Sequence, residues 1–297
     1  MRVASMGIDV AIARGLDVVV LNDSLQVVFG PETLRLADLP DLIRRTEPNV
    51  IAIDSPPSWA LSGKSRPIER QLQALGINIF PTPAAEFARD LHRWMETGFD
   101  VFKVASDLGY PLNTAAASFA PSAIEVSPHA SAVVLRGSLA PVGVAKYFWR
   151  RSVLEAAGVA CSEMRTTDHV DAALAALTGL RFLGGDFSVV GTPGEAVLVL
   201  PIGKMPTTRY VRALEAAIDR RSDMHAARRP PTDEALHPCR CGCGAPARRR
   251  YLPGHDAKHR SRLLAEMRAG SGPAADELQR LGWGRMPAAA NSLLRKR

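Results

Sequence analysis

The sequence predicts an α/β fold, in which strands and helices alternate around a central sheet. Short apolar patterns typical of strands alternate with longer helical patterns through the first 205 residues. The pattern at residues 50–53 is apolar throughout, as in a parallel strand that is buried on both faces. With 46% hydrophobic and 6% aromatic residues, the chain of 297 residues can bury one or two ordinary cores. This composition excludes disorder, collagen and coiled coil as descriptions of the whole chain.

The predicted order of elements near the N-terminus is strand, strand, strand, helix, strand. Turn residues, among them Gly15 and Asn22, separate the first three strands. Pro48 ends the helix, and Asp54 stands where the fourth strand stops. The strands are expected at residues 3–10, 17–22, 25–29 and 50–53, and the helix at residues 33–46.

The rest of this domain is expected to be mainly helical, with two further strands. Thr167 is the expected N-cap of a late helix, which alanine and leucine residues sustain as far as Leu177. Helical patterns cover most of residues 66–114 and residues 146–157, and strands are expected at residues 122–126 and 196–200. Pro201 follows the last strand and ends the predicted domain.

Positive charge is concentrated in the C-terminal third of the chain. Residues 1–205 carry 18 Lys and Arg against 21 Asp and Glu, whereas residues 206–297 carry 19 against 9. A basic tail beside a mildly acidic domain favours electrostatic binding of a polyanion, most simply nucleic acid. A solvated tail that only keeps the protein soluble fits the composition equally well.

Acidic residues stand at the ends of predicted strands and on one late helix. Asp9 and Asp54 end the first and fourth strands, and Glu125 lies near the end of the fifth. Asp168 and Asp171 are three residues apart, so they share one face of their helix. If the first and fourth strands are neighbours, these carboxylates meet in the crevice where open α/β sheets bind ligands. A single Asp at a strand end is more often only a turn former.

Several carboxylates in one site repel one another unless a divalent cation neutralises them. Oxygen ligands select a hard ion, Mg²⁺ or Mn²⁺. Two such ions about 4 Å apart can activate a water and stabilise the leaving oxygen in phosphodiester hydrolysis. The pattern therefore points to metal-dependent hydrolysis.

Several segments resemble the signature of an uncharacterised family of predicted nucleases with the RNase H-like fold. They are residues 6–11, 51–57, 124–129, 168–174, 191–195 and 199–201. The resemblance covers roughly residues 1–202, and the Asp-x-x-Asp-Ala pattern that begins at Asp168 is also similar to Holliday-junction resolvases. It implies a mixed five-stranded sheet flanked by helices and a two-metal site. Its strand ligands would be Asp9 and Asp54, and its helix ligands Asp168 and Asp171.

Two positions depart from the wider superfamily pattern. Asp54 stands where that pattern often has Glu, so a metal there would be held through water. Glu125 matches only the family's own Glu-x-x-Pro motif, and it could be a catalytic ligand, a substrate contact or a structural residue.

Weaker candidates are basic residues and histidines near these motifs. Arg66, Arg70 and Lys146 could contact phosphates, although surface helices carry such residues more often for solubility. His129 and His169 could assist proton transfer, although a structural hydrogen bond is the more common use.

A cysteine cluster in the basic third predicts a zinc site. Cys239, Cys241, Cys243 and His255 supply three thiolates and one imidazole within 17 residues, which suits tetrahedral Zn²⁺. His259 and His237 are substitutes for the fourth ligand. The segment resembles short zinc beads of bacterial and phage proteins that combine a Cys-x-Cys-Gly-Cys-Gly run with a later Pro-Gly-His-Asp. Reduced thiols without metal are the alternative, and Cys161 is expected to be a packing residue.

The chain is therefore expected to have four parts. They are a nuclease domain at residues 1–205, a helix and linker at 206–236, a zinc bead at 237–260 and a basic helical tail at 261–297. Basic side chains around the bead could hold phosphates without sequence preference. They are Arg248, Arg249, Arg250, Lys258, Arg260 and Arg262.

No apolar run reaches the roughly 18 to 20 residues of a membrane span, and no signal-peptide pattern opens the chain. We therefore expect a cytoplasmic protein without a membrane partner. The leading hypothesis is a metal-dependent nuclease whose basic zinc-bearing tail holds the substrate. The second is a nucleic-acid-binding protein of the same fold that does not cut. A phosphotransferase or ATPase is disfavoured because no glycine-rich phosphate loop follows a predicted strand.

Overall fold

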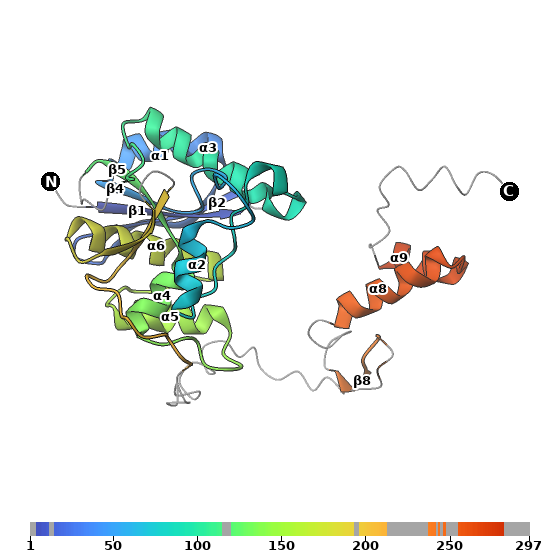
Figure 1. Ribbon diagram of the computed structural model, residues 1–297. Coiled ribbons are helices and arrows are strands. Elements are labelled where there is room, and N and C mark those ends of the chain that lie inside the picture. The colour runs from blue at the N-terminus through green and yellow to red at the C-terminus, as the bar shows by residue number, and fades with distance from the viewer. Residues whose placement is uncertain are drawn as a thin grey trace. The chain divides into compact units, whose positions relative to one another are not determined.

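The structure is a computed structural model that separates into two units, Met1–Ala216 and Ala217–Arg297. It describes residues 4–11, 15–114, 120–192, 196–212, 237–241, 243, 246–247 and 255–281. The first unit is an α/β domain in which helices lie on both faces of one sheet (Figure 1). This confirms the predicted fold class.

The sheet of the first unit contains seven strands among the described residues. They are β1 (Ala4–Ala11), β2 (Gly15–Asn22), β3 (Val27–Leu34), β4 (Val50–Asp54), β5 (Ser122–Val126), β6 (Ser188–Thr192) and β7 (Ala196–Leu200). Their spatial order is β3-β2-β1-β4-β5-β7-β6. Strands β1, β4, β5 and β7 are parallel, and β2 and β6 run antiparallel to their neighbours. The first and fourth strands are adjacent, as the convergence of the acids requires. The sheet has two strands more than the five that the resemblance implies, and one more than the six that the sequence pattern predicts.

Helices cover the two faces of the sheet in separate groups. They are α1 (Leu39–Thr46), α2 (Pro67–Ala74), α3 (Arg93–Asp107), α4 (Pro128–Arg136), α5 (Lys146–Ala156) and α6 (Thr167–Leu183). Helices α1 and α3 bury Leu42 and Val101 against Met6 and Ile8 of β1. Helix α6 lies across β1, β2 and β4 on the opposite face, and α4 and α5 pack against α6 (Figure 1). Short 3-10 helices occur at Leu36–Asp38, Ala85–Phe87 and Asp90–His92.

Helix α6 approaches β1 closely because both elements carry small residues at the contact. A Cβ atom at Gly7 would overlap the backbone of Ala172 and Ala176, and one at Gly179 would overlap the Ser5 hydroxyl. The two glycines therefore permit a helix–sheet distance that larger residues would prevent. This contact fixes the N-terminal end of α6 over the carboxyl end of the parallel strands.

Several predicted boundaries are wrong for identifiable reasons. The third strand extends to Leu34 because it pairs with β2 along its length, so the helix begins at Leu39 rather than at residue 33. Thr166, not Thr167, caps α6, and its Oγ1 accepts a hydrogen bond from the backbone N–H of His169 at 3.1 Å. Helix α4 and strand β6 were not expected, and much of residues 66–114 is irregular.

The second unit contains a small hairpin and a pair of helices. Strands β8 (His237–Pro238) and β9 (Pro246–Ala247) are antiparallel. Helices α8 (His255–Arg268) and α9 (Gly272–Arg280) pack through Leu263, Ala274 and Leu278. Helix α8 begins six residues before the predicted start at 261. Residues 207–212 are not helical, and the rest of the helix predicted there falls outside the described residues.

Among the helices that the structure describes, none combines the length and apolar character needed to cross a membrane.

The contact between α6 and β1 can be tested at Gly7. We expect Gly7→Ala to lower the free energy of unfolding by about 3 kcal/mol, since its Cβ would enter the α6 backbone. Urea unfolding followed by circular dichroism measures the change. Gly184→Ala is the matched control, because its Cβ would meet Leu180 O at an ordinary 3.5 Å. Equal stability of both variants would contradict the packing described here.

Candidate functional site

Three aspartates form a row across neighbouring strands. Side chains alternate along a strand, so Asp9 lies on the α6 face, whereas Ile8 enters the core beneath α1 and α3. Asp9 is paired in register with Asp17 of β2 and with Asp54 of β4. Because paired residues of adjacent strands point to the same face, all three carboxyl groups lie on the side covered by α6.

Helix α6 brings two further carboxylates to this row. Asp168 lies in its first turn, and a carboxylate oxygen from each of Asp168, Asp9 and Asp17 falls within 4.8 Å of the other two. Asp171 is one turn further and, like Asp168, acts electrostatically on Asp9. The structure therefore brings together four of the predicted acids, with Asp9 at the centre. We call Asp9, Asp17, Asp54, Asp168 and Asp171 the acidic row.

Three members of the acidic row, Asp9, Asp54 and Asp171, retain protons more strongly than isolated aspartates do. Burial, and then the charges of Asp54, Asp171 and Asp168, raise the pKa of Asp9. Burial, and then the charge of Asp171, raise the pKa of Asp54, while Arg150 opposes the shift. Burial raises the pKa of Asp171 to about 6. Full ionisation of these three carboxyl groups is therefore unfavourable without a compensating positive charge.

A buried arginine binds one carboxylate oxygen of Asp171, and the other oxygen lacks a hydrogen-bond partner among the described residues. Arg150 Nη1 donates a hydrogen bond to Asp171 Oδ2, and the two residues are 7% exposed each. Asp171 Oδ1 and Arg150 Nε have no hydrogen-bond partner among the described residues. A buried acceptor without a partner is costly, and a cation or an ordered water beside Oδ1 would remove that cost.

Asp17 is a member of the row that the sequence analysis missed. It is 3% exposed, and Thr33 Oγ1 donates a hydrogen bond of 2.6 Å to its Oδ1. His169 Nε2 lies 3.5 Å from the same oxygen. Asp17 could have been predicted from its short separation from Asp9 along the sequence. When two antiparallel strands are joined by a tight hairpin, residues at that separation lie opposite each other.

The two predicted histidines differ in their surroundings. His169 Nδ1 accepts a hydrogen bond from the backbone N–H of Arg165 at 3.3 Å, which leaves Nε2 to carry the proton towards Asp17 in the neutral ring. Burial, and then the charges of Arg150 and Lys146, lower the pKa of His129 to about 4. His129 is therefore neutral near pH 7.

Glu125 does not join the acidic row. It is paired in register with Ile53, whose side chain belongs to the opposite core, so its side chain leaves the sheet on the other face from Asp54. Arg66 Nη1 and Nη2 donate to both of its carboxylate oxygens at 2.8 and 2.6 Å. Burial raises the pKa of Glu125 even so. Of the three roles considered for Glu125, the arrangement favours the structural one.

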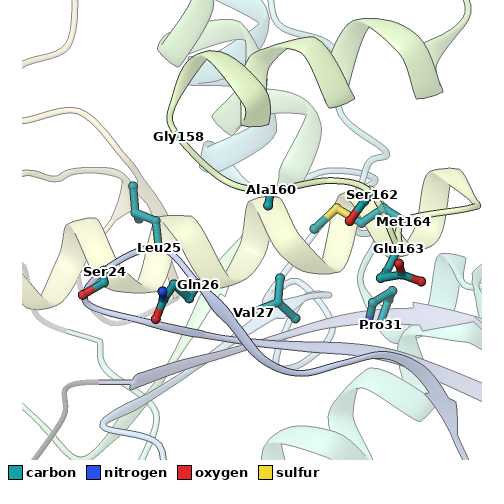
Figure 2. A pocket seen from close by; sticks show the side chains of 10 residues that line it. All are labelled: Ser24, Leu25, Gln26, Val27, Pro31, Gly158, Ala160, Ser162, Glu163 and Met164. Carbon is teal, nitrogen blue, oxygen red and sulfur yellow. The ribbon is translucent and has the colours of Figure 1, made fainter.

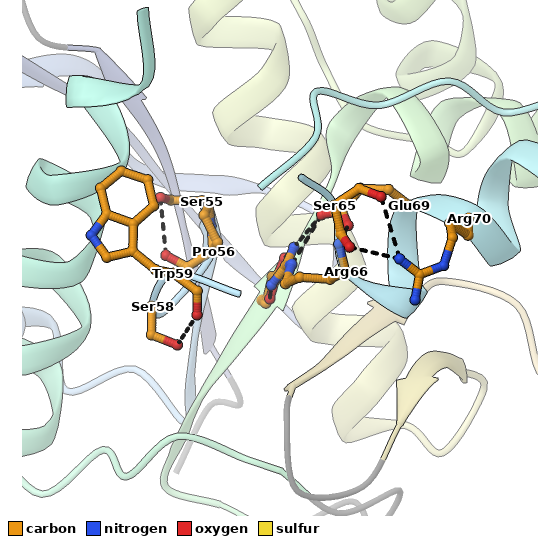
Figure 3. Close-up of polar contacts among 9 residues, drawn as sticks. Ser55, Pro56, Ser58, Trp59, Ser65, Arg66, Glu69 and Arg70 are labelled. Atoms are coloured by element: carbon orange, nitrogen blue, oxygen red, sulfur yellow. Dashed lines mark hydrogen bonds and ion pairs between the residues drawn. The ribbon is translucent and has the colours of Figure 1, made fainter. Parts of the chain in front are cut away.

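Arg66, a weaker candidate for contacting phosphates, is instead buried in ion pairs and does not lie on a surface helix face. Its side chain is 2% exposed, and it binds Glu69 as well as Glu125. Figure 3 shows Arg66 beside Glu69 and the guanidinium of Arg70 turned towards Ser65, whose carbonyl accepts a bond of 2.7 Å. Arg70 and Lys146 are exposed.

The cysteine cluster of the second unit could bind a metal such as zinc. One sulfur from each of Cys239, Cys241 and Cys243 lies within 4.8 Å of the other two, and the first two are 3.4 Å apart. Strands β8 and β9 bracket the cysteines and close the turn that carries them. Three sulfur ligands leave one position of a tetrahedral site to a fourth donor.

Helix α8 is tied to this turn. Arg262 Nη1 donates a hydrogen bond of 3.0 Å to the carbonyl of Cys241. His259 is 5% exposed, and burial lowers its pKa. His255 is the first residue of α8, but its side chain and that of His237 lie outside the described part. Of the basic residues predicted around the bead, Lys258, Arg260 and Arg262 are exposed, and Arg248, Arg249 and Arg250 are not among the described residues.

A separate cavity of about 260 Å³ lies between the β2–β3 turn and the loop that precedes α6. Figure 2 shows Leu25 and Val27 on one side of it and Ala160 and Met164 on the other. None of its lining residues belongs to the acidic row.

The fold and the site together define an α/β protein with a row of carboxylates near the carboxyl ends of parallel strands. The chain belongs to the family described as "Protein of unknown function (DUF429)", whose family model matches residues 7–196. No curated protein and no solved structure matches the chain. The acidic row falls entirely within the matched residues, whereas the cysteine cluster lies beyond them.

The buried pair of Arg66 and Glu125 makes a prediction about stability. Arg66→Met removes the partner of a buried carboxylate, so we expect the free energy of unfolding to fall by about 3–5 kcal/mol. Chemical denaturation measures this change. Arg44→Met is the control, since its bond to Asp41 is on the surface and is worth less than about 1 kcal/mol. A loss no larger than that of the control would show that the pair is dispensable.

The cysteine cluster makes a prediction about metal content. We expect about one equivalent of zinc per chain in the purified protein, and a loss of most of it in Cys239→Ser. Elemental mass spectrometry measures both. Cys161→Ser should retain the metal, because Cys161 is a buried packing residue of the first unit. Equal metal content in the two variants would exclude the cluster as the site.

Proposed function

We propose that this protein is a nuclease that uses divalent metal ions bound by the acidic row to hydrolyse phosphodiester bonds. The observation that carries the proposal is the convergence of five buried or half-buried aspartates on one face of a parallel-centred sheet. The sheet also supports an RNase H-like fold, because a five-stranded mixed sheet fits within it as β3-β2-β1-β4-β5.

The donor set fits Mg²⁺ or Mn²⁺. All of its ligand atoms are carboxylate oxygens, which hard cations prefer. Asp9 stands between two groups, Asp17 and Asp168 on one side and Asp54 and Asp171 on the other. The unpartnered Oδ1 of Asp171 supplies a further acceptor. These five aspartates are the residues that would hold the divalent ions.

The surrounding residues orient the row. Arg150 fixes one oxygen of Asp171, and Thr33 fixes one oxygen of Asp17. His169 is placed to hold the same oxygen of Asp17. Bound ions would supply an activated water and would neutralise charge on the phosphate. The protein's own part is to keep the carboxylates in place before substrate arrives.

The C-terminal third supports binding of a polyanion. Its balance of 19 basic and 9 acidic residues contrasts with the acidic balance of residues 1–205. We assign the cysteine cluster to structural Zn²⁺, with His255 as the fourth ligand and His259 as the substitute. The tail would then hold DNA or RNA through its phosphates, in the cytoplasm, while the first unit cuts.

One observation favours a second candidate, a nucleic-acid-binding protein of the same fold that does not cut. Arg150 already supplies one positive charge to Asp171, so part of the row is neutralised without a metal. In that case the row would stabilise the fold, and binding would not lead to turnover.

Cleavage assays test the nuclease proposal. The substrates are single-stranded, duplex and branched DNA and RNA–DNA hybrids, each with Mg²⁺ or Mn²⁺. We expect Asp9→Asn to reduce the rate at least about 100-fold, because bound metal contributes several kcal/mol to transition-state stabilisation. At limiting metal the rate should rise with pH through about 6 to 7, since protons on Asp171 and Asp54, whose pKa values are about 6 and about 7, compete with the cation.

Asp23→Asn is the matched control, because Asp23 is exposed in the turn between β2 and β3 and should leave the rate unchanged. Equal rates for wild type and Asp9→Asn, or no cleavage of any substrate, would contradict the proposal. Salt-sensitive binding without metal-dependent turnover would select the second candidate.

A further inference from the structure

An apolar pocket lies in the irregular segment between α2 and α3. It has a volume of about 470 Å³, which is within the usual range for ligand sites. Phe80, Phe87 and Leu91 line it and are 47%, 41% and 56% exposed. A group of large exposed apolar side chains around one hollow is unusual on a protein surface and typically marks a binding site.

The pocket shares one lining residue, Phe80, with a small cavity at the end of β4. Phe80 also lines a small cavity of about 60 Å³ whose other walls include Asp54, Arg66 and Trp94. Phe80 thus stands between the pocket and the residue that ends β4. The pocket therefore lies near the end of β4, where Asp54 stands.

The ring of Phe80, which lines the pocket, packs against other aromatic side chains on its far side. The ring of Phe80 meets His92 and Trp94 edge-on, with centroids 5.6 and 6.0 Å apart. Trp59 packs edge-on against His92 at 6.5 Å. His92 Nδ1 accepts a hydrogen bond of 2.9 Å from the backbone N–H of Arg89. A ring that is fixed on one side and open on the other needs little ordering when a flat ligand stacks on it.

The charges at the pocket favour an anionic ligand. Lys64 and Arg89 line it, against one acid, Glu86. Lys64 Nζ lies 5.9 Å from the centre of the Phe87 ring. Aromatic faces beside basic groups are the arrangement by which proteins bind single strands, since bases stack on the rings and cations contact the backbone. A wholly apolar peptide would use the rings but not the basic groups.

We propose that this pocket takes an unpaired base of single-stranded nucleic acid near the end of β4, where Asp54 of the acidic row stands. The inference rests on the proposed function, because it assigns the substrate class of the same site. Bases inside a duplex are stacked and cannot reach a pocket wall without being extruded. The protein therefore prefers a single strand, or a single-stranded stretch of a branched molecule.

Binding assays with the full chain test the pocket separately from catalysis. The probe is a fluorescein-labelled oligothymidylate of about 12 nucleotides, within the usual range of site sizes, and its partner is the same backbone with abasic positions. Anisotropy is measured in Ca²⁺ on the Asp9→Asn background, so that no cleavage is needed. Loss of the bases should weaken binding at least about fivefold, the smallest effect expected from one stacked base.

Phe87→Ala should abolish this difference between the two probes, and Phe87→Trp should preserve it. Phe148→Ala is the matched control, because Phe148 is equally exposed, at 43%, but lies on α5 outside the pocket. Electrostatic binding by the basic tail does not depend on bases, so it contributes equally to both probes. Retention of the full difference in Phe87→Ala, or no difference in the parent protein, would overturn the inference.

The two proposals fail in different ways. If the wild type cleaves nucleic acid but Phe87→Ala does not change the difference in binding between the two probes, the nuclease proposal stands and the pocket proposal is rejected. Base-dependent binding that Phe87→Ala removes, without cleavage by the wild type, would keep the pocket and reject the nuclease.

Discussion

The close packing of α6 on β1 determines the geometry of the site. Gly7 and Gly179 leave no side chain at the contact, so the helix lies against the strand backbone. The first turns of α6 then stand over Asp9, and residues more than 150 positions apart in the chain share one electrostatic environment. A larger residue at Gly7 would displace the helix and, with it, Asp168 and Asp171. The small residues at this contact therefore position the acidic row as well as pack the core.

The acidic row contains more carboxylates than nearby positive charges, and this excess favours binding of a cation. Arg150 compensates one carboxylate of the row, whereas Arg66 pairs with Glu125 and Glu69, which do not belong to it. Proteins tolerate such an excess of buried negative charge when a ligand offsets it, and perturbed acids of this kind cluster at functional sites. The two arginines therefore have different structural roles. Arg150 orients Asp171, and Arg66 holds the start of α2 beside β5.

The sequence predicted the positions of the site acids better than their roles. Strand ends and helical spacing located Asp9, Asp54, Asp168 and Asp171, because those patterns are local. The place of Asp17 depended on hairpin register, and the burial of Glu125 against Arg66 depended on a contact between residues 59 positions apart. Helix α4 was missed because no helix was expected directly after the strand at residues 122–126, whereas Pro128 is the first residue of a helix capped by Ser127. Residues 33 and 34 were predicted to begin a helix, but they belong to β3 because they pair with β2.

The most direct test of the central claim, that the acidic row is a divalent-cation site, is anomalous diffraction from crystals of the full chain soaked in Mn²⁺. The account predicts manganese bound by oxygens of Asp9, with Asp17 and Asp168 or with Asp54 and Asp171 completing the shell. Saturating Mn²⁺ that leaves no anomalous peak at Asp9, in crystals that bind the ion elsewhere, would contradict it.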